Sequence, residues 1–254
     1  MIAHMAISGP GTMSAPFTIY SKGNIGESIT VDINHDTNMV SLTIRRAAES
    51  ARIAKIPGEQ AKWFAHLTLH RHDLTLATTY LAEFDRLAEE EGTPPPVLAA
   101  LWESALIAVV KCFTYNESRT SLDQDTVFGQ SEPTITPERA EFNHLKHLRN
   151  KHIAHDENDW IQAHPLVIID YENSEPTVSS LHGMVIRGES NNADNIARLH
   201  RSVEIALTWV EREWAKVADQ VKADLSALSA DELAALPDVT GQLPNEGSVK
   251  RTRP

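Results

Sequence analysis

The amino-acid sequence predicts a mainly helical protein, a bundle of four main helices with an N-terminal β-hairpin and a small inserted β-hairpin. Two observations support this fold class. Apolar residues recur at steps of three and four through most of the chain beyond residue 57, whereas strict alternation of apolar and polar residues is confined to two regions. The hydrophobic content of 41% is ordinary for a globular protein and can supply a core.

These patterns divide the 254 residues into segments. Residues 1–14 are predicted to be disordered or foreign to the natural chain, and residues 15–56 to form a β-hairpin extension and a linker. Residues 57–225 are predicted to form the helical bundle domain, with the β insertion near 164–187. Residues 226–254 are predicted to be a mobile tail, apart from a turn of helix at Asp231–Leu236.

The first hairpin is predicted from two alternating stretches. Apolar and polar residues alternate over 29–33 and again over 40–44. The four residues between, His-Asp-Thr-Asn at 35–38, are typical of a turn.

Two helices are predicted next, near 59–91 and 95–117. The apolar positions of the first are spaced by three and four: Trp63, Leu67, His70, Leu74, Ala77, Leu81, Phe84 and Ala88. Gly92 ends that helix, and Pro94 opens the next, because proline is tolerated in a first turn. Glu103 and Lys111 interrupt the apolar runs of the second helix, so no segment is predicted to span a bilayer.

A third helix is predicted near 137–155, after a polar loop at 118–132. Thr136 offers a capping hydroxyl, and proline and glutamate follow it, as is typical of a first turn. The insertion then follows as two short strands, Leu166–Ile169 and Thr177–Ile186, around a turn.

The last helix, near 192–225, has the most regular pattern. An apolar stripe runs along it over more than six turns and consists of Leu199, Val203, Leu207, Val210, Trp214, Val217 and Val221. We interpret this stripe as bundle core. The alternative is a coiled-coil seam with a second chain.

Charge and cysteine content restrict the environment and the partners. The formal net charge is −12, so most of the surface would repel nucleic acid, and any nucleic-acid site must be a local basic patch. The single cysteine, Cys112, lies among apolar residues and is predicted to be a buried thiol. The absence of cysteine pairs and of a secretion signal in Met1–Ser14 predicts a cytoplasmic protein.

One such basic patch lies at the end of the third helix. Residues 137–155 hold four basic residues, two acidic residues and four histidines, a net charge of +2. This local reversal of sign is what a polyanion site would need. A helix C-terminus also favours Lys, Arg and His through its dipole alone, so a solvated, His-rich helix end is the competing interpretation.

Histidine spacing allows a further hypothesis. His66 and His70 are four residues apart on one predicted helix, a geometry that can hold zinc, although Leu67 stands where zinc proteases have glutamate. A metal-dependent hydrolase that uses these two residues with His144 and His147 is therefore one alternative. No glycine-rich phosphate loop, nucleophile elbow or Cys-x-x-Cys pair is present.

The stretch Leu148-Arg149-Asn150-Lys151-His152-Ile153-Ala154-His155-Asp156 resembles the Arg-x(4–6)-His motif of HEPN domains, and most closely their abortive-infection branch. The resemblance implies a helical bundle that dimerises and a metal-independent ribonuclease in a toxin or phage-defence setting. It implies RNA as substrate, a protein antitoxin or defence partner, and no cofactor. The two hairpins are not part of the usual bundle of this family.

The resemblance also assigns roles to residues. His155 exchanges protons near neutral pH, Arg149 contacts phosphate oxygens, and Asn150 orients the phosphate or a histidine. Substrate contacts are assigned to Lys146, His147, Lys151 and His152. The other alternative is a non-catalytic interaction protein in which the same residues bind RNA, a nucleotide or a partner.

Helix geometry sets a condition on this site. Arg149 and His155 are six residues apart, so on one regular helix they would point about 120° away from each other. Either the helix distorts near Ala154 or the site is composite across the two-fold axis of a homodimer. The predicted dimer uses this helix end, the last helix, or both.

Overall fold

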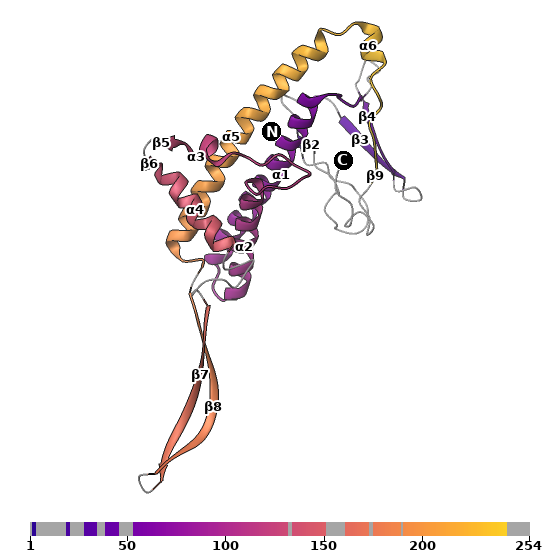
Figure 1. The fold of residues 1–254 in the computed structure, drawn as a ribbon. Coiled ribbons are helices and arrows are strands. Elements are labelled where there is room, and N and C mark those ends of the chain that lie inside the picture. Colours follow the sequence, from indigo (N-terminus) through magenta and orange to yellow (C-terminus); the bar gives the residue numbers. More distant parts are fainter. Residues whose placement is uncertain are drawn as a thin grey trace. The chain divides into compact units, whose positions relative to one another are not determined.

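The computed structural model describes residues 2–3, 19–20, 28–34, 39–45, 53–131, 134–150, 161–172, 175–188 and 190–242 (Figure 1). Over these ranges the chain is mainly helical, as predicted. The helices are α1 (Glu59–Ala88), α2 (Pro95–Cys112), α3 (Gln124–Phe128), α4 (Pro137–Leu148), α5 (Ala193–Ser226) and α6 (Ala230–Ala234). Two compact units share the chain, and α1 and α5 each contribute to both.

The first unit, residues 1–69, 116–120 and 211–254, contains most of the short strands. Strands β3 (Ser28–Asn34) and β4 (Met39–Arg45) pair antiparallel, and β9 (Thr240–Gln242) adds a third strand beside β4. Strands β1 (Ile2–Ala3) and β2 (Ile19–Tyr20) form a separate pair. The segment predicted to be a mobile tail thus contains α6 and β9 in its described part.

An aromatic contact joins the two long helices within the first unit. The rings of Phe64 in α1 and Trp214 in α5 lie 5.0 Å apart between centroids. The Trp214 indole N–H donates a hydrogen bond of 3.0 Å to the Thr68 hydroxyl, which satisfies the polar atom of a buried tryptophan.

The second unit, residues 70–115 and 121–210, contains α2, α3, α4 and the remaining parts of α1 and α5. Its core includes three phenylalanine rings: Phe142 of α4 lies 4.5 Å from both Phe113 and Phe128. These three residues are almost fully buried and join the end of α2, α3 and α4. The thiol of Cys112 is also buried, which confirms the prediction for it.

Helix α2 is shorter than predicted, and the predicted polar loop at 118–132 contains structure. The helix ends at Cys112 rather than at 117, and the Leu122 N–H donates to the Cys112 carbonyl. Asp123 then caps α3 by accepting a bond from the Thr126 N–H at 3.0 Å. The loop prediction was wrong there because a polar cap precedes only two apolar residues, Val127 and Phe128, both of which are buried.

One described helix, α2, is long and apolar enough to cross a membrane by length and composition alone. Core helices of soluble proteins pass the same test. In this structure Trp102, Leu106, Val109 and Val110 of α2 are fully buried.

Most of the apolar stripe of α5 is buried within the chain. Its members Leu199, Val203, Val210, Trp214 and Val221 are at most 6% exposed. Leu207 and Val217 are half-buried, so most of the stripe, but not all of it, is core, as interpreted from the sequence.

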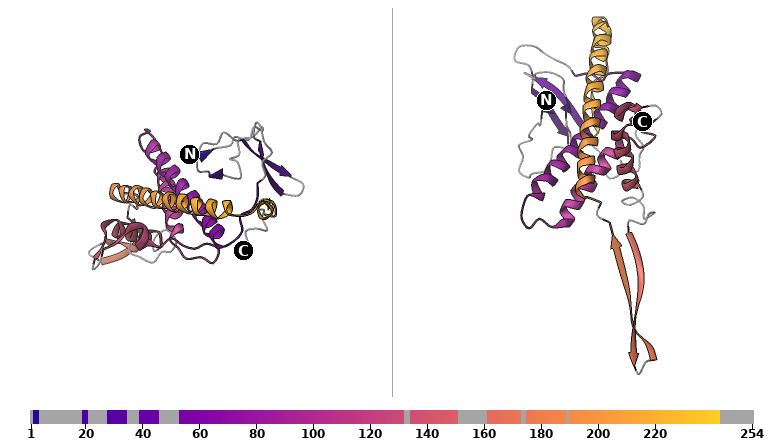
Figure 2. Two further views of the ribbon diagram at one scale, coloured as in Figure 1. Left: turned by 90° about the horizontal axis from the view of Figure 1, so that it is seen from above. Right: turned by 90° about the vertical axis from the view of Figure 1, so that its left-hand side faces the viewer.

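The inserted hairpin is longer than predicted. Strands β7 (Ile161–Glu172) and β8 (Glu175–Arg187) pair antiparallel over their whole length and form a two-stranded ribbon, drawn in orange in Figures 1 and 2. A β-bulge interrupts the register between Ile168 and Ile169. Strands β5 (Gln130–Ser131) and β6 (Thr134–Ile135) form a short pair before α4.

Candidate functional site

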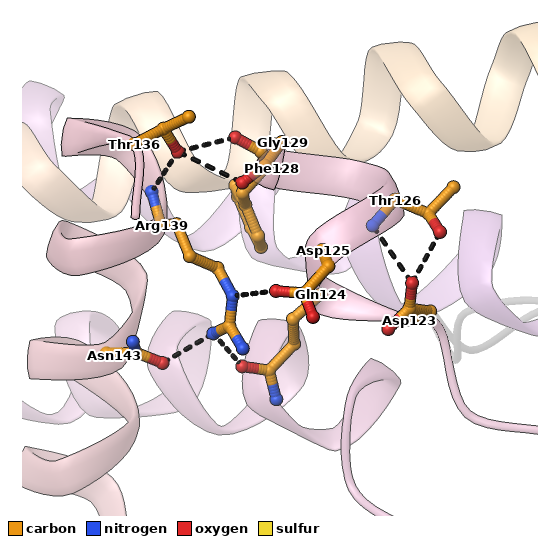
Figure 3. Close-up of polar contacts among 9 residues, drawn as sticks. All are labelled: Asp123, Gln124, Asp125, Thr126, Phe128, Gly129, Thr136, Arg139 and Asn143. Carbon is orange, nitrogen blue, oxygen red and sulfur yellow. Dashed lines mark hydrogen bonds and ion pairs between the residues drawn. The ribbon is translucent and has the colours of Figure 1, made fainter. Parts of the chain in front are cut away.

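The site predicted from the sequence lies on α4, whose first turn is held in place by Thr136. The Thr136 hydroxyl accepts a hydrogen bond from the Arg139 N–H at 3.2 Å and donates to the Phe128 carbonyl at 2.8 Å (Figure 3). Gly129 between α3 and α4 has a φ of 83°, a conformation that other residues rarely adopt. The capping pattern read from the sequence therefore also anchors α4 to the end of α3.

Arg139, one turn into α4, holds α3 and α4 together. Its guanidinium donates to the Asp125 carboxylate at 2.9 Å and makes close contacts to the side-chain oxygens of Gln124 and Asn143 (Figure 3). Its side chain is only 16% exposed. Arg139 belongs to the basic segment of the sequence, but its charge is directed to a structural contact rather than to a substrate.

The middle of α4 is tied to α5 by two contacts. Arg201 donates two hydrogen bonds to the Glu141 carboxylate, at 2.6 and 3.0 Å, and these bonds lower the pKa of that carboxyl below its usual range. His144 Nε2 lies 3.0 Å from the Asn195 side-chain oxygen. Asn195 is itself 1% exposed and donates to the Ser190 carbonyl. Sequence reasoning missed Asn195, because no local pattern connects residues so far apart in the chain.

The C-terminal end of α4 has a buried side and a polar side. Leu145 and Leu148 are buried, whereas His147 is exposed and Lys146 is half-buried. Lys146 and His147 therefore stand in the last turn on the solvent side, as the substrate-contact assignment requires.

Arg149 and Asn150 follow directly and contact each other. The Arg149 guanidinium donates a hydrogen bond of 3.0 Å to the Asn150 side-chain oxygen, and both residues are half-buried. Two of the three residues assigned to catalysis are thus brought together. The third, His155, lies outside the described residues, as do Lys151 and His152.

The structure describes the predicted helix 137–155 only as far as Asn150. Its regular α-helical part, α4, ends at Leu148, and Arg149 and Asn150 lie in a wider, π-helical turn. Such turns are frequent at functional sites because they shift side chains out of the regular helical phase. The 120° separation expected for Arg149 and His155 holds only on a continuous α-helix, and residues 151–155, which would set their relative direction, lie outside the described residues.

The metal hypothesis finds no assembled ligand set in the described part of the chain. No group of three or more His, Cys, Asp or Glu side chains gathers there. His66 lies 3.2 Å from the Thr120 hydroxyl, His70 is fully buried, and His144 contacts Asn195.

Comparisons with protein-family models, curated proteins and solved structures found no match for this chain. The resemblance to HEPN domains therefore remains a prediction from the motif that begins at Leu148.

Proposed function

We propose that this protein is a HEPN-like, metal-independent ribonuclease that cleaves RNA through attack by the substrate's own 2′-hydroxyl. The observation that carries the proposal is the contact between Arg149 and Asn150, which lies at the end of a helix anchored to the core and opens the Arg-x(5)-His motif. The net positive segment in a chain of net charge −12 gives RNA a local site of opposite charge.

Each residue has a distinct part in the proposed reaction. The Arg149 guanidinium has five N–H donors, and the bond to Asn150 uses one of them, which orients the planar group. The other donors can contact two phosphate oxygens and stabilise the charge that develops on the phosphorane. His155 exchanges the proton of the attacking hydroxyl or of the leaving oxygen, because an imidazole titrates near neutral pH.

The substrate preference follows from the nucleophile. DNA lacks the 2′-hydroxyl and should resist cleavage. Single strands and loops should be cut faster than duplexes, because the reacting hydroxyl must move into line with the leaving oxygen. The products should carry 2′,3′-cyclic phosphate ends.

The test compares four proteins on a mixed pool of single-stranded RNA, each with and without a chelator: wild type, Arg149→Ala, His155→Ala and Arg201→Ala. The first two substitutions should each lower the cleavage rate on the order of 10²–10³-fold. Arg201→Ala is the matched control, because it removes the same charge from a surface pair with Glu141 outside the motif.

The outcomes separate the three functions. Equal cutting by all four proteins would identify a contaminating nuclease. Loss of cutting with the chelator would favour a metal-dependent hydrolase that uses the histidines. RNA binding that depends on Arg149 without any cleavage would favour the non-catalytic interaction protein.

The biological setting belongs to the same proposal. We expect a cytoplasmic toxin or phage-defence protein, a homodimer, with a protein antitoxin or defence partner, as the motif implies. Because most of the stripe on α5 is buried within the chain, only its half-buried members Leu207 and Val217 remain for a dimer contact on that stripe.

A further inference from the structure

The ribbon formed by β7 and β8 has two chemically different faces. Successive side chains of a strand point to opposite faces, so cross-strand partners share a face. One face carries the partners Gln162 with Ile186, His164 with Met184, Leu166 with His182 and Ile168 with Ser180. We call this the mixed face.

Polar atoms on the mixed face pair along each strand. His164 Nε2 lies 3.3 Å from the Gln162 side-chain oxygen, and the Ser180 hydroxyl lies 2.8 Å from His182 Nε2. Both contacts join residues two positions apart, as two side chains on one face of a strand must be. The mixed face therefore carries hydrogen-bonded polar groups among its apolar side chains.

Outside the bulge at Ser179, the opposite face has no polar side chain over the same length. Its members, which we call the apolar face, are Ala163, Pro165, Val167, Ile169, Val178, Leu181, Gly183 and Val185. The bulge contributes to this composition. Val178 pairs with Ile169 because one extra residue, Ser179, is left without a cross-strand partner between this pair and the pair Ile168 with Ser180.

The apolar face is exposed. Its five large side chains at positions 167, 169, 178, 181 and 185 are 45–79% exposed. Such a face offers apolar surface on the order of 500 Å² per copy, which approaches the ~800 Å² per partner of a standard interface. A lone two-stranded ribbon is marginally stable in water, so this face needs a second layer.

Charge restricts what that second layer can be. Residues 162–169 and 178–186 contain no Asp, Glu, Lys or Arg, although the whole chain has a net charge of −12. Two copies of this chain repel each other over most of their surfaces. Over this uncharged face, two copies can come into contact without bringing charges of the same sign together.

The apolar face is also complementary to itself. Leu181, 79% exposed, is its most prominent side chain, and Gly183, two residues along the same strand, leaves open space where a side chain would stand. Leu181 and Gly183 are ~7 Å apart on one face of the strand. In a second copy that runs in the opposite direction, the order of the two residues is reversed, so each Leu181 lies opposite the other copy's Gly183. A two-fold axis between the packed ribbons, at the level of His182, would seat each Leu181 in the gap at the partner's Gly183.

We propose that the apolar face of the β7–β8 ribbon is the docking surface for a second copy of this chain. The two ribbons pack face to face about a two-fold axis as a small four-stranded sandwich, with the mixed faces outward. This interface is independent of the proposed ribonuclease activity, because it uses no residue of the Arg149 motif.

The first test uses two neighbouring isoleucines on opposite faces. Ile169 on the apolar face is 45% exposed and Ile168 on the mixed face is 47% exposed. In the full-length protein, Ile169→Asp should weaken dimerisation at least about a hundredfold, because each dimer would bury two carboxylates. Ile168→Asp should leave the dissociation constant unchanged. Sedimentation equilibrium measures the constant, and circular dichroism checks that both variants keep their helices.

A second test exchanges the projection and the gap. Gly183→Leu fills the gap and should weaken the dimer, although it adds a side chain that suits a strand better than glycine does. The double variant Leu181→Gly with Gly183→Leu restores one projection and one gap, and should recover most of the lost association.

Two results would overturn the proposal. One is a dimer that tolerates Ile169→Asp as well as it tolerates Ile168→Asp, since association would then use another surface. The other is a wild-type protein that stays monomeric at about 100 μM, where interfaces of this size associate. Flotation of that monomer with neutral phosphatidylcholine vesicles, lost in Ile169→Asp, would assign the apolar face to a lipid surface instead.

Discussion

The two ends of α4 carry similar residue types but use them differently. At the first end, Thr136 and Arg139 are engaged by Phe128, Asp125 and the side chains around them, so their polar atoms hold α4 in place. At the last end, Lys146 and His147 stand on the solvent side, and Arg149 donates a hydrogen bond to its neighbour Asn150.

This difference shows how a basic stretch of sequence should be read. The net charge of residues 137–155 counts Arg139 and Glu141, yet both are paired with residues outside the segment, Asp125 and Arg201. The positive charge that can meet a substrate is therefore concentrated at Lys146 and Arg149 among the described residues. The composition of residues 137–155 therefore overstates the length of the basic surface, although it gives the sign of its charge.

The largest expected effect on stability comes from replacing Phe142, whose ring fixes the middle of α4 to the core and so supports both ends of the helix. Phe142 is fully buried against two other phenylalanine rings. Phe142→Ala should lower the free energy of unfolding by about 3–5 kcal/mol, because it leaves a cavity in the core. Urea denaturation measures this change. Because α4 would lose its support, any RNA cleavage should fall with it, and a stable, fully active variant would contradict this role of Phe142.

The sharpest comparison is between the two arginines. Arg139→Ala should lower the free energy of unfolding by about 2 kcal/mol, because it leaves the oxygens of Asp125, Gln124 and Asn143 without a charged donor. Arg149→Ala should change it by less than about 0.5 kcal/mol. Thermal unfolding of both variants tests this, and equal destabilisation would show that Arg149 also holds the fold.

A smaller effect should follow from the cap of α4. Thr136→Ala removes the acceptor for the Arg139 N–H and should cost about 1 kcal/mol of stability. Thr136→Ser keeps the hydroxyl and should retain most of that stability in the same denaturation experiment. If the serine variant loses as much as the alanine variant, the methyl group packed near Gly129 matters more than the cap.

The smallest effect concerns pH. Arg201 lowers the pKa of Glu141, so the ionised form of this carboxyl group is favoured more in the folded state than in the unfolded state. This stability is present above the unfolded carboxyl pKa and is lost as pH falls through the lower, folded pKa. The pair is partly exposed, so it contributes under about 1 kcal/mol. The difference in unfolding free energy between wild type and Arg201→Ala should therefore shrink in acid, and a difference that grows in acid would contradict this assignment.

Local sequence patterns predicted the helices well where burial and capping agree. Most of the apolar positions predicted along α1 and α5 are buried. Helix α1 ends at Ala88, three residues short of the predicted end at 91, before Gly92 with its φ of 88°. The start of α4 was predicted to the residue, because threonine, proline and glutamate form a strong local signal.

Long-range contacts and helix ends could not be predicted in the same way. The partners of Arg139 and His144 lie on α3 and α5, and no periodicity links those positions. The π-helical turn at Arg149 has no signal in composition, since the sequence after Leu148 still consists of residues that suit an α-helix. The inserted strands were predicted too short because the apolar alternation marks only their most hydrophobic part.

The bulge beside Ile168 has a consequence for how the length of the ribbon can change over evolution. Strand positions alternate between faces, so adding or deleting one residue in β8 between Val178 and Leu181 would exchange the faces of every residue on one side of the change. A change of two residues would leave both faces intact. Related ribbons should therefore differ in length by even numbers, and an odd difference should coincide with the gain or loss of a bulge.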